Sequence, residues 1–135
     1  MVKIKRTFIK KPWGAEDWLV ENEHYVVKHL YINPKEELSL QYHNEKHETM
    51  IVLEGMGELI LGREGHAEKE KDDFHSRTCE YLTITQGDII TIPPKTIHKI
   101  RAFTGLKILE ISTPQTNDLV RIDDKYGRNS YGRYK

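Results

Sequence analysis

The sequence contains a single cysteine, Cys79, which excludes a scaffold held together by internal disulfides. It has no excess of charge either. Its 21 Lys and Arg residues balance 21 Asp and Glu residues, so no overall field favours nucleic acid. No apolar run reaches the length of a membrane span, and residues 1–6 are not followed by the apolar core of a signal peptide. We therefore expect a cytoplasmic protein with neither nucleic acid nor a membrane among its partners.

Sustained helical periodicity is also missing. Instead, turn residues separate short runs rich in Val, Ile, Leu, Thr and Tyr; they occur at Asn33-Pro34, Gly55, Gly57, Gly62, Gly65, Gly87, Pro93-Pro94 and Gly105. This spacing favours an all-β protein, either an antiparallel sandwich or a barrel. A length of 135 residues and a hydrophobic content of 37% agree with one small domain whose strands have one wet face.

Two polar segments interrupt this pattern. Residues 63–80 include ten charged side chains among eighteen positions, which indicates a long solvated loop. A lid over the mouth of a barrel is the functional alternative, because long loops in compact domains are often functional. Residues 129–135, at the end of the second polar segment, are expected to form a frayed terminus.

Four side chains form a candidate ligand set for one divalent metal: Gln41, His43, Glu48 and His98. Imidazoles suit first-row transition ions, and the carboxylate and amide oxygens add harder donors. Residues 38–43 are predicted to form a strand that places Gln41 and His43 on one face, because side chains alternate with period two. Glu48 precedes the apolar run 50–53, and His98 follows the run 89–92. Ligands from separate strands can meet inside a small barrel.

Taken alone, two histidines such as His43 and His47 in a polar stretch indicate a solvated face more often than a metal site. The wider pattern carries the argument, with Gln41, His43, Glu48 and Gly55 followed later by Gly87, Pro93 and His98. This pattern resembles the two motifs of the cupin family, although Lys95 replaces a customary Gly and Ala102 a customary Asn. The resemblance implies a cupin double-stranded β-helix (jelly-roll) barrel that binds one divalent ion, such as zinc, manganese, iron or nickel.

The flanking segments resemble one subfamily more closely, the C-terminal domain of type II mannose-6-phosphate isomerases. The matching segments are Lys11-Pro-Trp-Gly14 with Glu16 and Trp18, residues 27–34 and 38–43, Ile92-Pro93, His98, residues 109–111 and residues 119–128, which end in Tyr126-Gly-Arg128. In that family the domain is usually fused behind a mannose-1-phosphate guanylyltransferase, for which these 135 residues leave no room. We expect residues 1–135 to be a single cupin domain, of which 6–128 resemble the family.

The resemblance implies interconversion of mannose 6-phosphate and fructose 6-phosphate. Two departures bear on this activity. Lys46 stands where those isomerases have an Arg, and Thr49-Met50 replaces a His-Trp pair. Lysine lacks the planar fork of donors that arginine offers to a sugar or phosphate. A non-catalytic cupin that binds a sugar or a nucleotide sugar therefore stays open as an alternative, as does an epimerase acting on a related sugar.

An aldose–ketose isomerase needs a base near the metal to move a proton between neighbouring carbons. Lys46 and His47 precede Glu48 directly and are candidates, although His47 is equally consistent with a surface residue. Glu110 lies on a predicted late strand, where an inward carboxylate would be paired, metal-linked or catalytic. Candidate phosphate contacts, each otherwise a solvated charge, are Lys99, Arg101 and Arg121.

A small barrel built from open sheets is expected to cover a sheet edge with a partner. Symmetric dimers are the commonest assembly, so we expect a homodimer. The segment 7–9, followed by Trp13 and Trp18, is the predicted contact. The remaining expected partner is a small molecule, a sugar phosphate or a nucleotide sugar.

Overall fold

The structure of the protein, a computed structural model, describes residues 2–62, 80–115 and 117–128. The described part forms eleven strands: β1 (Thr7–Lys11), β2 (Gly14–Glu21), β3 (Val26–Ile32), β4 (Leu40–His43), β5 (Glu48–Glu54), β6 (Met56–Leu61), β7 (Glu80–Thr85), β8 (Ile89–Ile92), β9 (His98–Ala102), β10 (Leu106–Ser112) and β11 (Leu119–Asp123). Over the same residues, no helix has the length and apolarity needed to cross a membrane. The predicted loop, apart from Glu80, and the predicted frayed terminus 129–135 lie outside the described residues.

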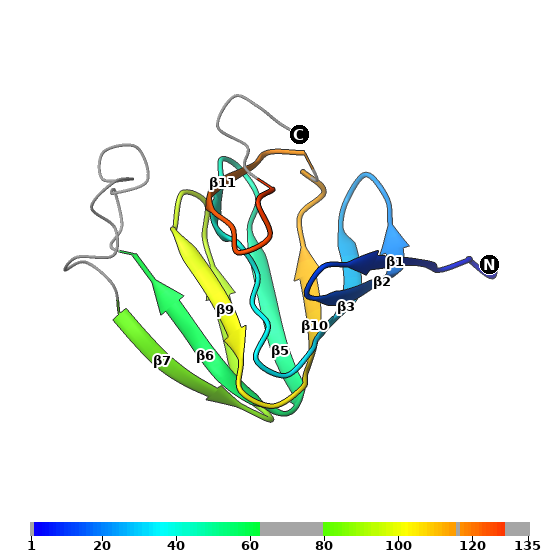
Figure 1. Ribbon diagram of the computed structural model, residues 1–135. Coiled ribbons are helices and arrows are strands. Elements are labelled where there is room, and N and C mark those ends of the chain that lie inside the picture. Colours follow the sequence, from blue (N-terminus) through cyan, green and yellow to red (C-terminus); the bar gives the residue numbers. More distant parts are fainter. Residues whose placement is uncertain (1, 63–79, 116, 129–135) are drawn as a thin grey trace.

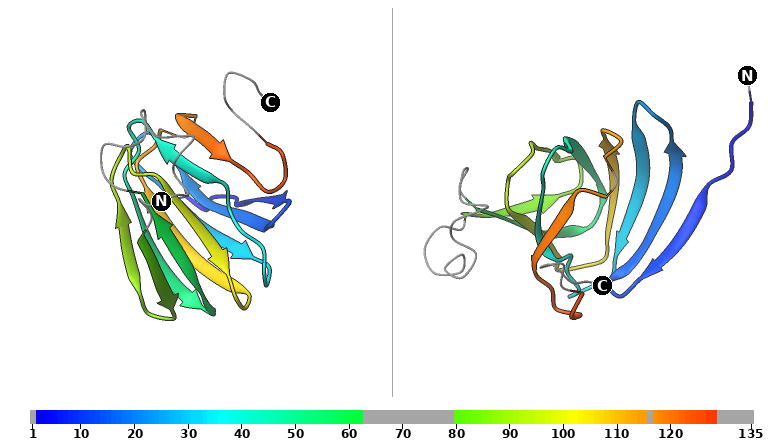
Figure 2. Two further views of the ribbon diagram at one scale, coloured as in Figure 1. Left: turned by 60° about the vertical axis from the view of Figure 1, so that its left-hand side comes forward. Right: turned by 90° about the horizontal axis from the view of Figure 1, so that it is seen from above.

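The strands form two sheets that face each other, as Figures 1 and 2 show. One sheet has the order β1-β2-β3-β10-β5-β8 and the other the order β11-β4-β9-β6-β7. Each pair of neighbouring strands is antiparallel. From β3 onward, every connection between consecutive strands passes from one sheet to the other, except the one between β6 and β7. This is a jelly-roll arrangement, and the all-β prediction is confirmed.

The residues that face the space between the sheets follow the expected alternation. In β3, Val26, Lys28, Leu30 and Ile32 are buried, while the residues between them are more exposed. Inward side chains of both sheets form one apolar cluster made of Trp13, Leu30, Ile32, Leu38, Met50, Val52, Leu59, Ile84, Ile92, Ile100, Ala102, Leu106 and Ile108. Burying a side chain the size of isoleucine contributes about 1.5–3 kcal/mol to folding.

The apolar cluster and the polar inward residues occupy different stretches of the same strands. Strand register places Ile32 beside Leu106 and Leu30 beside Ile108, and all four side chains are apolar. One row further along, Lys28 lies beside Glu110. The polar side chains therefore collect at one end of the space between the sheets, and the core fills the other end.

Trp13, which was predicted to contribute to a dimer contact, belongs to this core. Its exposed fraction is only 3%, and it packs with the apolar cluster between the sheets. The strand that precedes it is different, because Phe8 in β1 is 61% exposed. Any partner at this edge would therefore meet β1 and not Trp13.

Candidate metal centre

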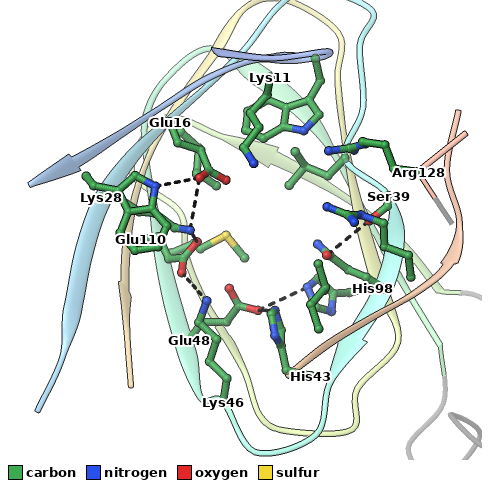
Figure 3. Close-up of a pocket in the computed structure, with 18 residues that line it drawn as sticks. Lys11, Glu16, Lys28, Ser39, His43, Lys46, Glu48, His98, Glu110 and Arg128 are labelled. Carbon is green, nitrogen blue, oxygen red and sulfur yellow. Dashed lines mark hydrogen bonds and ion pairs between the residues drawn. The ribbon is translucent and has the colours of Figure 1, made fainter. Parts of the chain in front are cut away.

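A cavity of about 210 Å³ opens at the polar end of the space between the sheets (Figure 3). Most of its lining side chains are charged or polar. They are Lys11, Glu16, Lys28, Ser39, Gln41, His43, Lys46, Glu48, His98, Glu110, Arg121 and Arg128.

Three of these residues, from three different strands, converge on one point. The Nε2 atom of His43 in β4 lies 3.3 Å from Oε2 of Glu48 in β5. The Nε2 atom of His98 in β9 lies 3.4 Å from the same oxygen. One candidate ligand atom from each side chain lies within 4.8 Å of the other two. All three side chains are largely shielded from solvent, with exposures of 11%, 4% and 2% for His43, Glu48 and His98.

Strand register explains why these residues meet. Gln41 in β4 pairs directly with His98 in β9, and paired residues in an antiparallel sheet project to the same face. His43 lies two positions after Gln41, so it faces the cavity as well, as the alternation predicted. Glu48 begins β5 in the opposite sheet. The amide oxygen of Gln41 accepts a hydrogen bond from Ser39 Oγ at 3.3 Å and borders the same cavity.

Both imidazoles are oriented by their other ring nitrogen. The Nδ1–H of His43 donates to Oδ1 of Asp118 at 3.0 Å, and the Nδ1–H of His98 donates to the carbonyl oxygen of Thr96 at 2.9 Å. Asp118 also accepts hydrogen bonds from the backbone N–H groups of Glu45 and Lys46. A metal-binding histidine is typically fixed in this way, which leaves Nε2 available for the ion.

Asp118 is itself held in its charged form. Burial would raise its pKa, but the backbone N–H of Glu45 and the His43 ring lower it, as does the backbone N–H of Lys46. Sequence reasoning missed Asp118, because it lies 75 positions from His43 and has no motif of its own.

The centre carries a buried negative charge. Burial alone would raise the pKa of the Glu48 carboxyl, but the facing imidazoles of His43 and His98 hold it below its usual range. Burial would likewise lower the pKa of His98, yet the Glu48 carboxylate raises it. Among the described residues, Glu48 Oε2 has no partner with proper hydrogen-bond geometry. Donor atoms that converge without bonding well to one another fit a divalent ion, and two imidazoles with a carboxylate suit zinc, manganese, iron or nickel.

A chain of lysines and carboxylates forms the neighbouring wall of the cavity (Figure 3). Lys46 Nζ lies 3.2 Å from one oxygen of Glu110, and Lys28 Nζ lies 4.0 Å from the other. Lys28 also approaches Glu16 at 3.7 Å and stands 4.3 Å from the centre of the Trp18 ring. Side-chain exposure is 13% or less for the four charged residues. Buried charges need such pairing.

The charge on Lys46 follows from this pairing. Burial would lower its pKa, but the carboxylates of Glu110 and Glu48 raise it. Lys46 is therefore an ammonium, which can donate hydrogen bonds and stabilise negative charge. Glu110, on β10, is 4% exposed and lines the cavity.

Three predicted site residues lie elsewhere. His47 is exposed, and its backbone N–H donates to Thr113 Oγ1. On β9, Lys99 pairs with Glu37 at 3.0 Å and Arg101 pairs with Glu58 at 2.6 Å. Both alternate with the inward His98, so they point away from the cavity.

Arg121 does line the cavity. Sequence reasoning missed Lys28 and Arg128 as members of the site. Lys28 could have been found from the sequence, because it stands between Val26 and Leu30 in the series of inward residues along β3, which are otherwise apolar.

The chain is 27% identical over 125 residues to the xanthan biosynthesis protein XanB of Xanthomonas campestris, a match that covers 89% of this chain and 23% of that protein. It is 28% identical over 130 residues to the alginate biosynthesis protein AlgA of Pseudomonas aeruginosa, covering 90% of this chain and 23% of that protein. The chain thus spans about a quarter of the length of these relatives.

Solved structures support the fold. The capsular polysaccharide assembling protein CapF from Staphylococcus aureus superposes with a TM-score of 0.65 at 15% identity, covering 90% of this chain and 35% of that one. An RmlC-like cupin protein from Desulfovibrio desulfuricans superposes with a TM-score of 0.56 at 24% identity, covering 79% and 82%. These matches confirm the predicted cupin fold. The family model described as "Mannose-6-phosphate isomerase C-terminal" matches residues 2–124, and the chain therefore belongs to that family.

Proposed function

We propose that this chain is a metal-dependent isomerase of a sugar phosphate that interconverts mannose 6-phosphate and fructose 6-phosphate. The observation that carries the proposal is the buried cluster of His43, Glu48 and His98, which shares one cavity with the Lys46–Glu110 pair. Membership of the mannose-6-phosphate isomerase C-terminal family supports the same reaction class.

His43, Glu48 and His98 would hold the ion, and Gln41 borders the same cavity with its amide oxygen. A divalent ion in this position would act as a Lewis acid toward the oxygens of the substrate. The roles of Asp118 and the Thr96 carbonyl are to fix the two imidazole rings, so that the ligand atoms stay converged before substrate arrives.

The proton transfer is assigned to the neighbouring wall. Isomerisation removes a proton from the carbon next to the carbonyl and returns it to the adjacent carbon. Glu110 is the carboxylate on this wall closest to Lys46, and it can take and return that proton at its Oε2 atom. Lys46, as an ammonium, can donate a hydrogen bond to a substrate oxygen that gains charge during the transfer.

The second candidate is a non-catalytic protein that binds a sugar or a nucleotide sugar. An epimerase that acts on a related sugar is a further alternative. The observation behind it is Lys46 itself, which stands where the resembling isomerases have an Arg and is already engaged by Glu110 at 3.2 Å. An ammonium offers a point charge and not a planar fork, so the substrate could be bound without being turned over.

Formation of fructose 6-phosphate, measured in a coupled assay with and without added Mn²⁺, Zn²⁺, Fe²⁺ or Ni²⁺, separates the two functions. The isomerase proposal expects metal-dependent turnover, loss of turnover in Glu48→Gln, and equal or higher turnover in Lys46→Arg. Inactivity of both the wild type and Lys46→Arg with metal bound would refute it. The binding function would then be supported if mannose 6-phosphate or a nucleotide sugar raised the melting temperature.

We also infer that the chain forms a homodimer through β1. This strand is at the edge of the six-stranded sheet, and its side chains are nearly all exposed, including Phe8 at 61% and Ile9 at 37%. Exposed edges of this kind are usually covered. Light scattering should therefore give about twice the monomer mass of 15.9 kDa at micromolar concentration, and a monomer would contradict the inference.

A further inference from the structure

Lys28 and Glu16 are buried charged residues of the cavity wall, and neither takes part in the proton transfer assigned to Glu110. Lys28 on β3 is 8% exposed at its side chain, and Glu16 on β2 is 13% exposed. A buried ion pair is often no more stabilising than apolar side chains of similar volume. Stability of the fold therefore does not account for this pair, and its place in the cavity lining directs attention to the ligand.

The contacts of Lys28 are loose enough to admit an oxygen atom of a substrate. Its Nζ atom lies 3.7 Å from Oε1 of Glu16 and 4.0 Å from Oε1 of Glu110, and Figure 3 shows it between the two carboxylates. Charge-assisted hydrogen bonds are shorter, at about 2.7–2.9 Å. Because an ammonium carries three N–H donors, Lys28 can donate one of them to a substrate oxygen while it stays beside both carboxylates.

Trp18 holds the carboxylate and the ammonium in place. Strand register sets Trp18 on β2 directly beside Lys28, whose Nζ atom lies 4.3 Å from the centre of the indole ring. The indole Nε1–H donates to Oε1 of Glu16 at 2.8 Å. The second oxygen of Glu16, Oε2, is then the one that can take a proton from a ligand. An acid and a base are thus fixed side by side in the cavity wall.

The cyclic form of a sugar phosphate presents a matching pair of groups. In this hemiacetal the anomeric hydroxyl and the ring oxygen are bonded to the same carbon, C1. Aldose–ketose isomerisation needs the open chain, because only the open chain has a free carbonyl at C1. Opening the ring takes a base at the hydroxyl and an acid at the ring oxygen. The 3.7 Å separation of Lys28 and Glu16 lets the two oxygens on C1 contact both residues at once.

We propose that Glu16 and Lys28 open the ring of the sugar phosphate and thereby interconvert its α and β anomers, a second activity of the same cavity. The proposal rests on the proposed function for its class of substrate. It gives the cavity one acid–base pair for the ring and another, Glu110 with Lys46, for the open chain. Lys28 lies beside both Glu16 and Glu110, so opening leaves C1 next to the carboxylate that removes the proton from C2.

The ring-opening step balances without a co-reactant. Glu16 takes the proton of the anomeric hydroxyl at Oε2, and the electron pair of the broken O–H bond forms the second bond of the C1 carbonyl. The bond between C1 and the ring oxygen breaks, and the ring oxygen keeps its electron pair and takes a proton from the Lys28 ammonium. The proton on Glu16 then passes to the Lys28 amine, which restores both groups. Closure onto the other face of the carbonyl gives the other anomer.

Magnetisation-transfer NMR on mannose 6-phosphate measures this activity as the rate of exchange between the signals of the two anomers. The full chain loaded with Zn²⁺, which is diamagnetic, should raise the rate above that of buffer with the same zinc concentration. A general acid or base contributes roughly 100-fold or more, so Glu16→Gln and Lys28→Met should each remove nearly all of the protein-dependent rate. Zinc content should stay at the wild-type level, because neither residue is a ligand.

Lys28→Arg separates proton donation from charge and packing. Arginine keeps the positive charge beside Glu16 and Glu110 but does not give up its proton, so this variant should be as slow as Lys28→Met. A purely structural lysine would instead be rescued by arginine. Lys107→Met is the matched control, because Lys107 lies 5.9 Å from the Tyr31 ring centre on the outward face of the same sheet. It should exchange the anomers as the wild type does.

Wild-type protein that does not raise the exchange rate overturns the proposal, whatever the variants do. Wild-type rates in Glu16→Gln or Lys28→Arg overturn it as well, and so does an equal loss in Lys107→Met. Should the Lys28 variants fail to fold, Glu16→Gln decides the matter, because glutamine keeps the shape of the side chain and an oxygen that accepts the Trp18 hydrogen bond.

The same spectra separate this proposal from the isomerase proposal, because fructose 6-phosphate has signals of its own. Faster anomer exchange without fructose 6-phosphate leaves ring opening standing and removes the isomerase. Formation of fructose 6-phosphate without faster exchange leaves the isomerase standing and removes ring opening by Glu16 and Lys28.

Discussion

The two ends of the space between the sheets are built from the same strands, yet one end stabilises the fold and the other forms the candidate site. Strand β9 contributes His98 at one end and Ile100 next to it, and β10 contributes Glu110 and then Ile108. The core cluster consists of apolar side chains, whereas the cavity at the polar end is lined by buried lysines, carboxylates and imidazoles. A two-residue step along one strand therefore separates a position that stabilises the fold from one that serves the site.

This separation predicts that core variants lose stability and keep the site. Ile108 is fully buried at 0% exposure, so Ile108→Ala should lower the free energy of unfolding by about 2–5 kcal/mol. Metal affinity below the melting transition should be nearly unchanged. Denaturant titration and metal titration on the same preparation check the pair of results. A folded Ile108→Ala protein that has lost its metal affinity would break the distinction between the ends.

The converse prediction concerns the support of the metal ligands. Asp118→Asn keeps the shape of the side chain but removes the charge that orients His43, so metal affinity should fall roughly 10- to 100-fold. Thermal stability of the metal-free protein should change far less than in Ile108→Ala. Asp88→Asn is the control and should leave metal affinity unchanged, because Asp88 accepts a backbone hydrogen bond in an exposed turn away from the cavity.

A smaller effect is expected at the turn that precedes His98. Lys95 has a φ of 67°, a left-handed conformation that a non-glycine residue adopts at a cost of about 1–2 kcal/mol. Its backbone N–H donates to the carbonyl of His43, so the turn joins two ligand strands. Lys95→Gly should raise the free energy of unfolding by up to about 1 kcal/mol after the entropy of glycine is included. Clear destabilisation in a denaturant titration would contradict this reading of the turn.

The smallest expected effect is a pH dependence at the C-terminal segment. The Tyr126 hydroxyl donates to Glu36, and this bond, with Lys125, lowers the pKa of Glu36. Burial and the same bond raise the pKa of Tyr126 to about 12. The stability from Glu36 is present above its unfolded pKa and is lost as pH falls through the lower folded value. The stability from Tyr126 is present below its unfolded pKa and is lost as pH rises toward about 12.

Tyr126→Phe removes the Tyr126 contribution and the part of the Glu36 contribution that comes from their hydrogen bond, while the contact of Glu36 with Lys125 remains. The difference in stability between the wild type and this variant should be greatest near neutral pH and shrink at both extremes. A difference that stays constant from acid to alkaline pH would show that the hydrogen bond to Glu36 does not contribute through these ionisations.

The sequence predicted the parts of this molecule that depend on local pattern. Period-two alternation placed Gln41 and His43 on one face, and the apolar run around Glu110 indicated a late strand, although it left the direction of the Glu110 side chain open. The same rule, applied to β9, would have turned Lys99 and Arg101 outward once His98 was taken as inward. The same alternation along residues 26–32 would have turned Lys28 inward.

Other features depend on contacts between distant segments, which local patterns do not encode. Asp118 meets His43 because β11 pairs with β4. Arg128 lines the cavity with its guanidinium hydrogen-bonded to the carboxylate of Asp124. Whether Lys46 points inward also depended on the start of β5, which the structure places at Glu48, two positions later. These placements required the register between strands.

Metal content tests the central claim most directly. Elemental analysis of protein purified without chelator should find about one divalent ion per chain in the wild type, and almost none in the His43→Ala, His98→Ala double variant, whose fold is checked by thermal unfolding. Equal metal content in the two folded proteins would contradict the account, because the cluster of His43, Glu48 and His98 would then not be the metal centre.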